Sequence, residues 1–153
     1  MYTPDISNDL IFRDDQAVYG PRDHQRIISK LTTRLGTLYY DTKAIPLEPL
    51  PETMLDEGQA SRNDGPPATD LILSDNVSDQ TQIVIEVCHT KGLKRDTNKV
   101  IRLIDEDEYG ILEGFIYDYK TENWLRYSKG DAGLMTQTSF SKVLNLDLNA
   151  MLL

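Results

Sequence analysis

Two stretches of the sequence carry apolar residues at the spacing of an amphipathic helix. The first, residues 20–36, begins with Gly-Pro and stops at a glycine. Its apolar residues recur at intervals of three and four: Ile27, Ile28, Leu31 and Leu35. In the second, residues 93–104, one helical face collects Leu93, Val100, Ile101 and Ile104. We therefore expect two helices, each with one apolar face packed against another element.

Short β-rich runs separated by polar turns predict two hairpins. Residues 69–75 and 81–88 flank the turn "NVSDQ", and residues 113–119 and 123–128 lie on either side of "KTEN". Such close spacing favours antiparallel pairing. The predicted order is helix, loop, strand, strand, helix, strand, strand. This order is typical of an α/β (α+β) domain, with a mixed central sheet flanked by helices.

The remaining segments have a weaker pattern. Residues 10–20, "LIFRDDQAVYG", resemble one strand or two short strands. Residues 37–50 have a β-rich start, followed by prolines that confine any strand to an edge or an end of a sheet. Residues 51–67 are acidic and rich in Gly, Asn, Asp and Pro, which predicts a long loop. The leucine-rich tail, residues 139–153, favours a helix or a strand before a final turn.

Length and composition predict a single globular domain over residues 1–153. The chain is 39% hydrophobic and 27% charged, and no apolar run approaches the roughly 20 residues of a membrane span. The start, "MYTPDISNDL", lacks the pattern of a secretory signal, so we expect a cytoplasmic protein with no membrane partner. The lone cysteine, Cys88, excludes an internal disulfide and is either a small buried hydrophobe or a reactive thiol.

The charge of the chain is unevenly distributed. The whole sequence carries -9, which disfavours broad binding to nucleic acid. Residues 89–102 nevertheless carry a local charge of +4, which leaves about -13 for the rest of the chain. This basic segment is either a solvated helix face or a site of phosphate contacts. Its candidate nucleic-acid-binding residues are Lys91, Lys94 and Arg95.

Two carboxylates near the first predicted hairpin could share a site. Asp70 opens the first strand and Glu86 lies in the apolar run "IVIEV" of the second. Antiparallel pairing could bring both to one end of the sheet, where hard oxygen ligands suit Mg²⁺. A cation would also explain a carboxylate within a buried strand. Alternatively, Asp70 caps a strand start and Glu86 faces solvent.

The order of several short motifs resembles the Uma-two family of restriction-endonuclease-like proteins, in the PD-(D/E)XK nuclease superfamily. The motifs are the helix start "GPRDHQRII", a strand that begins at Asp70, "IVIEV", a lysine-bearing helix, "GFIYDY" and "LNLDLNAML". The likeness extends from about Asp14 to the end of the chain. It implies a restriction-endonuclease-like fold and a divalent metal, usually Mg²⁺.

The resemblance also implies roles for particular residues. Asp70 and Glu86 match the two metal-binding acids, and the Val87 carbonyl matches a backbone metal ligand. The superfamily expects a lysine two positions after the glutamate, where this chain has Cys88. In the Uma-two family a lysine of the following helix takes that role.

Two lysines and one histidine complete the implied site. "NKVIRL" resembles the lysine-bearing helix and points to Lys99 as catalytic, with Lys94 as the substitute. His24 matches the histidine of the first helix, although a lone histidine is more often structural. The family usually has proline before the first aspartate, whereas this chain has Thr69.

Three functions are compatible with these features. The leading hypothesis is a Mg²⁺-dependent endonuclease acting on DNA. The alternative is a catalytically inactive nuclease-fold protein that acts as a binding module through its basic helix. The third is a structural dimerisation domain without a ligand. Nucleases that cut two strands are commonly homodimers, so a homodimer is also expected.

Overall fold

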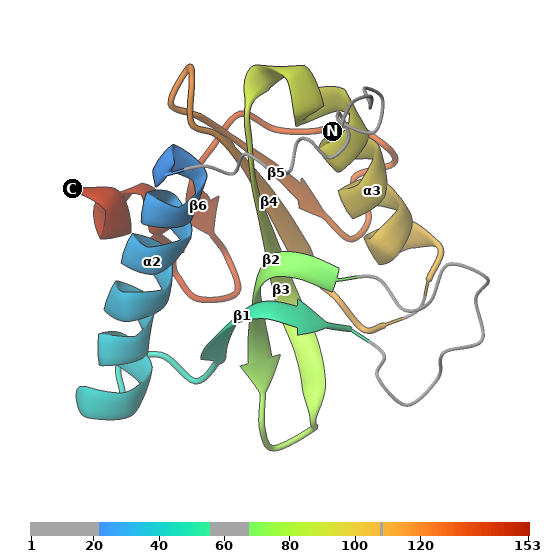
Figure 1. The fold of residues 1–153 in the computed structure, drawn as a ribbon. Coiled ribbons are helices and arrows are strands. Elements are labelled where there is room, and N and C mark those ends of the chain that lie inside the picture. Colours follow the sequence, from blue (N-terminus) through green and yellow to red (C-terminus); the bar gives the residue numbers. More distant parts are fainter. Residues whose placement is uncertain (1–21, 56–67, 108) are drawn as a thin grey trace, which may run out of the picture.

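A five-stranded mixed sheet lies between two helices (Figure 1). This computed structural model describes residues 22–55, 68–107 and 109–153. The strands occur in the sheet in the order of the sequence: β1 (Glu48–Met54), β2 (Ala68–Asp75), β3 (Gln80–Cys88), β4 (Glu113–Asp118) and β5 (Asn123–Ser128). The α+β class predicted from the sequence is confirmed.

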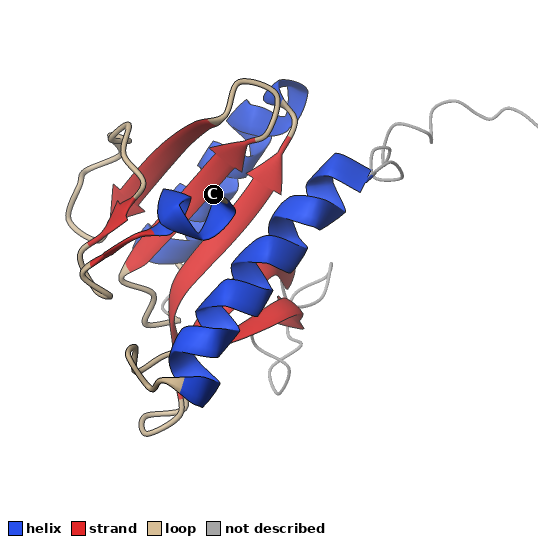
Figure 2. Ribbon diagram, turned by 90° about the vertical axis from the view of Figure 1, so that its left-hand side faces the viewer, coloured by secondary structure: helices blue, strands red, loops and turns tan. Residues whose placement is uncertain are grey.

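The two helices cover opposite faces of the sheet. Helix α2 (Arg22–Gly36) and helix α3 (Leu93–Asp105) lie on either side of the strands in Figure 1, and in Figure 2 α2 crosses the near face. Each helix has its own hydrophobic cluster. Ile83, Ile85 and Val87 pack on the α2 side, whereas Val84 and Cys88 pack on the α3 side. Strand β3 therefore alternates between two buried faces, which explains its nearly continuous apolar sequence.

The connections explain why the sheet is mixed. Strands β2 and β3 form the predicted antiparallel hairpin, and so do β4 and β5. Strand β3 instead pairs with β4 in parallel, with α3 as the connection between them. Parallel neighbours need a crossover of this kind because the chain must return to the same end of the sheet.

A close approach at Gly114 places α3 on β4. A Cβ atom at this position would lie 2.3 Å from Cγ1 of Val100 and 3.2 Å from Cδ1 of Ile104. Both are buried residues of α3. Glycine is therefore required here for packing, and it fixes the height of the helix above the strand.

Two predicted boundaries were wrong. Residues Thr37–Asp41 continue from α2 as a π-helical turn, η1, because this path packs Leu38 and Tyr39 against the core. The predicted loop over residues 51–67 begins later, since β1 extends to Met54.

Strand β1 lies at the edge of the sheet, as the prolines predicted. Prolines two residues apart lack their N–H groups on the same side of a strand, and an edge strand has one side that needs no partner.

The remaining elements complete the described part of the chain. The tail forms the short strands β6 (Phe140–Ser141) and β7 (Leu146–Asp147) and the 3-10 helix η3 (Leu148–Leu152). The strands predicted in residues 10–20 lie outside the described residues. Among the described helices, none has both the length and the apolar character needed to cross a membrane.

Candidate functional site

Glu86 is a buried carboxylate in the central strand of the sheet. Its side chain is on the α3 face with Val84 and Cys88, and the residue is 4% exposed. Burial raises the pKa of Glu86 to about 8, with smaller contributions from the negative charges of Asp70 and Asp96. Its Oε2 atom has no hydrogen-bond partner among the described residues. The positive charge of Lys99 opposes this shift only in part, so Glu86 is mostly protonated at pH 7 in the metal-free protein.

Lys99 is the cation that faces Glu86. Its Nζ lies 3.1 Å from Oε2 of Glu86, a contact that has ion-pair distance without the direction of a hydrogen bond. The same ammonium donates to the carbonyl oxygen of Ala68 at 2.6 Å. The side chain of Lys99 remains 26% exposed, so the ammonium stands between the buried carboxylate and solvent.

The structure separates Lys99 from Lys94. The two residues are five positions apart on a helix of about 3.6 residues per turn, so they point in different directions. Lys94 is exposed, and no ion pair is formed by it within residues 22–55, 68–107 and 109–153. Only Lys99 is brought to Glu86.

Asp70 lies beside Glu86, where the β2–β3 ladder ends. The last regular pair is Leu71 with Ile85, one residue from each carboxylate. Oδ2 of Asp70 accepts a hydrogen bond from the Val87 N–H at 2.8 Å. Asp70 and Glu86 are thus held on neighbouring strands at one end of the sheet. The repulsion between their negative charges contributes to the raised pKa of Glu86.

His24, in the first turn of α2, contacts the same oxygen of Asp70 that accepts from the Val87 N–H. Its Nε2 lies 3.3 Å from Oδ2 of Asp70, where it must carry a proton to donate. This hydrogen bond is the main reason that the pKa of His24 is raised, and a weaker one to the Val87 backbone acts in the same direction. The imidazole also packs edge-on against Tyr119, whose ring contacts His89 in the same way. His24 therefore contacts Asp70, one of the residues that the sequence assigned to a metal.

Asp96 is a buried acid that acts electrostatically on the candidate site and that the sequence did not single out. It lies in the first turn of α3, three positions before Lys99, and is 7% exposed. Its Oδ1 is 3.4 Å from Nε of Arg95, and its negative charge raises the pKa of both Glu86 and His24. A signal was present, since it is the single acid in the basic segment and is spaced one turn from Lys99.

The predicted nucleic-acid-binding residues lie at the beginning of the same helix. Lys91 belongs to the short 3-10 turn η2 (Thr90–Gly92), and Lys94 and Arg95 follow in the first turn of α3. All three are exposed. Their charges therefore border the site on the side of α3.

The residues present fit a divalent cation with water molecules in its coordination shell. Across the described ranges, no three His, Cys, Asp or Glu side chains are arranged to hold a metal by themselves. The available protein ligands are the carboxylates of Asp70 and Glu86 and the carbonyl of Val87. Mg²⁺ usually keeps several waters and takes only one or two carboxylates. Oε2 of Glu86 is buried without a hydrogen bond from the described residues, and a cation that used it would share or replace its 3.1 Å contact with the Lys99 ammonium.

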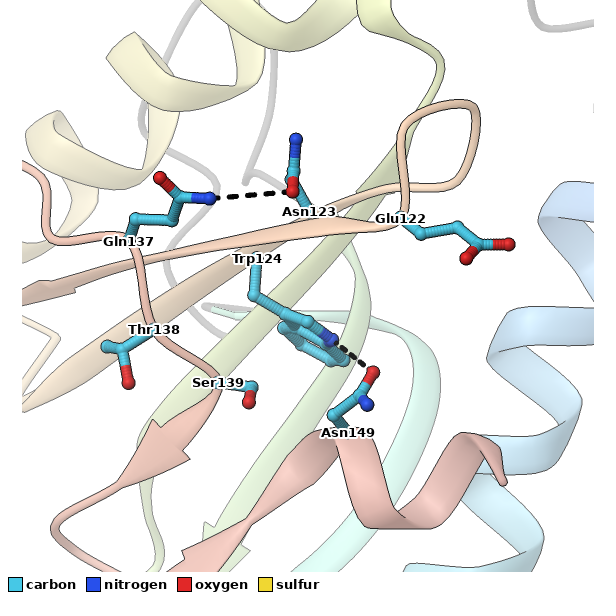
Figure 3. A pocket seen from close by; sticks show the side chains of 7 residues that line it. All are labelled: Glu122, Asn123, Trp124, Gln137, Thr138, Ser139 and Asn149. Atoms are coloured by element: carbon cyan, nitrogen blue, oxygen red, sulfur yellow. Dashed lines mark hydrogen bonds between the residues drawn. The ribbon is translucent and has the colours of Figure 1, made fainter.

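A separate surface pocket of about 240 Å³ lies beside β5 and η3 (Figure 3). Its walls are mainly uncharged polar side chains around Trp124, whose indole N–H donates to Oδ1 of Asn149 at 3.0 Å. It contains neither Asp70 nor Glu86. Without a cluster of titratable groups, this pocket is not the candidate reaction site.

Comparison with known proteins supports the nuclease-like fold. No protein-family model and no curated protein sequence matches this chain. The structure is similar to that of a protein from Anabaena variabilis ATCC 29413 described as a putative nuclease belonging to DUF820. The TM-score is 0.64 at 9% identity, over 86% of this chain and 80% of the neighbour. At this identity the likeness concerns the fold, which agrees with the fold implied by the sequence motifs.

Proposed function

We propose that this chain is a Mg²⁺-dependent endonuclease that hydrolyses phosphodiester bonds in DNA. The observation that carries the proposal is Glu86, a buried carboxylate with an unbonded oxygen that faces Lys99 in a nuclease-like fold. Buried structural carboxylates normally have their hydrogen bonds completed by the protein. Oε2 of Glu86 lacks such a hydrogen bond within the described residues and has the Lys99 ammonium beside it, a contact that a bound cation would share or replace.

Each proposed residue has a separate task. Asp70 and Glu86 would hold the cation together with the carbonyl of Val87, and His24 fixes the orientation of the Asp70 carboxylate. The bound cation would supply a more acidic water and neutralise charge on the phosphoryl group. The Lys99 ammonium is held in place by its hydrogen bond to the Ala68 carbonyl oxygen. An ammonium has three donor hydrogens, so Lys99 could also orient a water or a phosphoryl oxygen.

The exposed basic residues would contact the substrate away from the scissile bond. Lys91, Lys94 and Arg95 precede Lys99 on one continuous basic segment, whereas the rest of the chain is acidic. A nucleic acid backbone would therefore be attracted to this segment and repelled elsewhere. This arrangement supports a phosphate-rich substrate aligned along the start of α3.

A non-catalytic binding module is the second candidate function. The observation that favours it is the contact of His24 with Asp70, which partly satisfies that carboxylate without a cation. Such a module would bind nucleic acid through the basic segment without needing a metal. The two functions differ in whether Mg²⁺ stabilises the protein and whether the carboxylates are needed for cleavage.

Cleavage of DNA and thermal unfolding should be measured for the wild type, Glu86→Gln, Asp70→Asn and Lys99→Met, with Lys94→Met as the matched control. We expect Mg²⁺ to stabilise the wild type by mass action and not the two carboxylate variants. At saturating DNA, cleavage should be lost in those variants and strongly reduced in Lys99→Met, but kept in Lys94→Met, whose effect should be confined to DNA affinity.

Glutamine keeps the size of the Glu86 side chain, so Glu86→Gln should remain folded. Equal activity of all five proteins, each purified free of contaminating nucleases, would exclude catalysis at this site. DNA binding without cleavage or Mg²⁺ stabilisation would favour the non-catalytic module.

A further inference from the structure

Three partly exposed rings, those of His24, Tyr119 and His89, lie in a file beside the candidate site. Tyr119 is the middle ring. Its centroid lies 6.5 Å from that of His24 and 5.9 Å from that of His89, with interplanar angles of 73° and 84°. The rings come from the start of α2, from the residue after β3 and from the turn after β4. Segments distant in the sequence thus form one aromatic surface that solvent reaches.

The ring file touches the candidate metal site directly. Nε2 of His24, at one end of the file, lies 3.3 Å from Oδ2 of Asp70. A flat group bound against the rings would therefore lie beside the proposed cation.

Hydrogen bonds hold the segments that carry the rings. The Tyr119 N–H donates to the carbonyl oxygen of Cys88 at 2.9 Å, which joins the β4–β5 turn to the end of β3. The Thr90 hydroxyl donates to Oδ2 of Asp118 at 2.6 Å and joins the same two segments a second time. The ring file is therefore formed before any ligand binds, which lowers the entropy cost of binding.

His89 adds a hydrogen-bond donor to this surface. Its Nδ1 accepts from the Lys91 N–H at 3.1 Å, so the hydrogen of the neutral imidazole is on Nε2. Within residues 22–55, 68–107 and 109–153, Nε2 of His89 has no hydrogen-bond partner. This N–H is therefore available to an acceptor such as a phosphate oxygen.

Exposed cations accompany the rings. One lies one or two positions from each ring in the sequence: Arg22, Lys91 and Lys120. The acids next to them have partners of their own. Asp23 pairs with Arg26 at 3.1 Å, and buried Asp118 accepts backbone N–H groups of its own turn. The surface around the rings therefore favours an anionic ligand.

Packing explains only part of this arrangement. Tyr119 packs against the hydrophobic cluster on the α2 side, which accounts for the buried part of its ring. It does not account for an exposed cation beside each ring in a chain of net charge -9. Rings interleaved with cations are typical of surfaces that bind single-stranded nucleic acid, because the rings stack on bases and the cations contact phosphates. In a duplex the base faces are already stacked on one another.

We propose that the ring file binds an unpaired base of single-stranded DNA next to the candidate metal site. The inference deepens the proposed function, on which it rests for the choice of DNA as the ligand. It makes the substrate DNA that is unpaired at the point of cleavage. A base stacked at the rings would place its neighbouring phosphate between Asp70 and the exposed cations.

Fluorescence anisotropy in EDTA tests the inference without metal or cleavage. The Kd should be measured for a fluorescein-labelled single strand and for the duplex of the same sequence. We expect the wild type to bind the single strand more tightly. Tyr119→Leu should weaken binding of the single strand roughly five- to hundredfold, the value of one stacked base, and leave that of the duplex nearly unchanged.

Tyr119→Phe keeps the ring and should keep the affinity for the single strand. The matched control is Tyr40→Leu, which removes a 51% exposed tyrosine that packs edge-on against Tyr39, and it should change neither affinity. The salt dependence of binding should be the same in Tyr119→Leu as in the wild type, because no charge is removed.

His89→Asn provides a second test, since asparagine can still cap the following turn while the ring is lost. It should also weaken binding of the single strand selectively, and it decides the matter if Tyr119→Leu does not fold. A duplex bound as tightly as the single strand, or an equal loss of both in these variants, would overturn the inference.

The cleavage assay keeps the two proposals apart. Cleavage of duplex DNA that needs Glu86, without any preference for the single strand in binding, would overturn the inference and leave the proposed function. Selective binding of the single strand, without cleavage that depends on Glu86, would support the ring file as a binding surface and overturn the proposed catalysis.

Discussion

Glu86→Gln should remove a large part of the pH dependence of stability in the metal-free protein. The pKa of Glu86 rises from an ordinary 4.5 to about 8 on folding because the charged form is buried. The protonated side chain therefore contributes stability that is complete below about pH 4.5 and is lost as the pH rises to about 8. Glutamine cannot ionise, so this loss should be absent from the variant.

The expected size follows from the shift itself. A difference of this size in pKa corresponds to at most about 5 kcal/mol, of which about 4 kcal/mol falls between pH 5 and pH 9. Structural relaxation and water entry lower such penalties, so about 2–4 kcal/mol is a realistic range. For a chain of this length, this corresponds to roughly 5–15 °C in melting temperature.

The assay is thermal unfolding in EDTA from pH 5 to pH 9, followed by circular dichroism. The melting temperature of the wild type should fall relative to that of Glu86→Gln as the pH rises. A difference in melting temperature between the wild type and Glu86→Gln that is the same at every pH does not bear on the test, because a buried amide has its own hydrogen-bonding cost. Glu106→Gln, the same change at an exposed residue of the α3 end, serves as the control. Parallel pH profiles for the wild type and Glu86→Gln would refute the burial argument.

Three further changes test other parts of the structure. His24→Gln should destabilise the metal-free protein more at pH 5.5 than at pH 8.5. The raised pKa of His24 gives stability that is complete below the ordinary value of 6.5 and is lost as the pH rises through the pKa of the folded protein. Equal losses of unfolding free energy at the two pH values, measured by denaturant unfolding, would contradict this. Gly114→Ala should cost about 1–3 kcal/mol, since its Cβ would meet Val100 at 2.3 Å, and unchanged stability would contradict the packing of α3. Replacing Lys94 and Arg95 by alanine should weaken DNA binding and lower its salt dependence by up to roughly two charges, and an unchanged salt slope would make them a solvated face.

Local pattern was sufficient for the two helices and for both hairpins. The apolar spacing that predicted the two helices is the one that the packed core uses, with Ile28, Leu31 and Leu35 buried on α2. Both hairpins were predicted because their turns are short and polar. The β-rich start predicted from residue 37 was wrong, because Thr37–Asp41 form a π-helical turn. Packing at the end of α2 outweighs the local β preference of these residues.

The sequence by itself determined the kinds of side chain available for a site, together with the acidic chain and its single basic segment. It did not determine which face Glu86 occupies, because both faces of β3 are apolar and alternation gives no sign of which helix covers each one. The parallel pairing of β3 with β4 decided this by placing α3 over the Glu86 face. The same packing chose Lys99 over Lys94, since only Lys99 points from α3 toward the sheet. Asp96 is buried on α3 for the same reason, because which side of a helix is covered depends on how elements pack, and helix spacing alone carries no information about the partner.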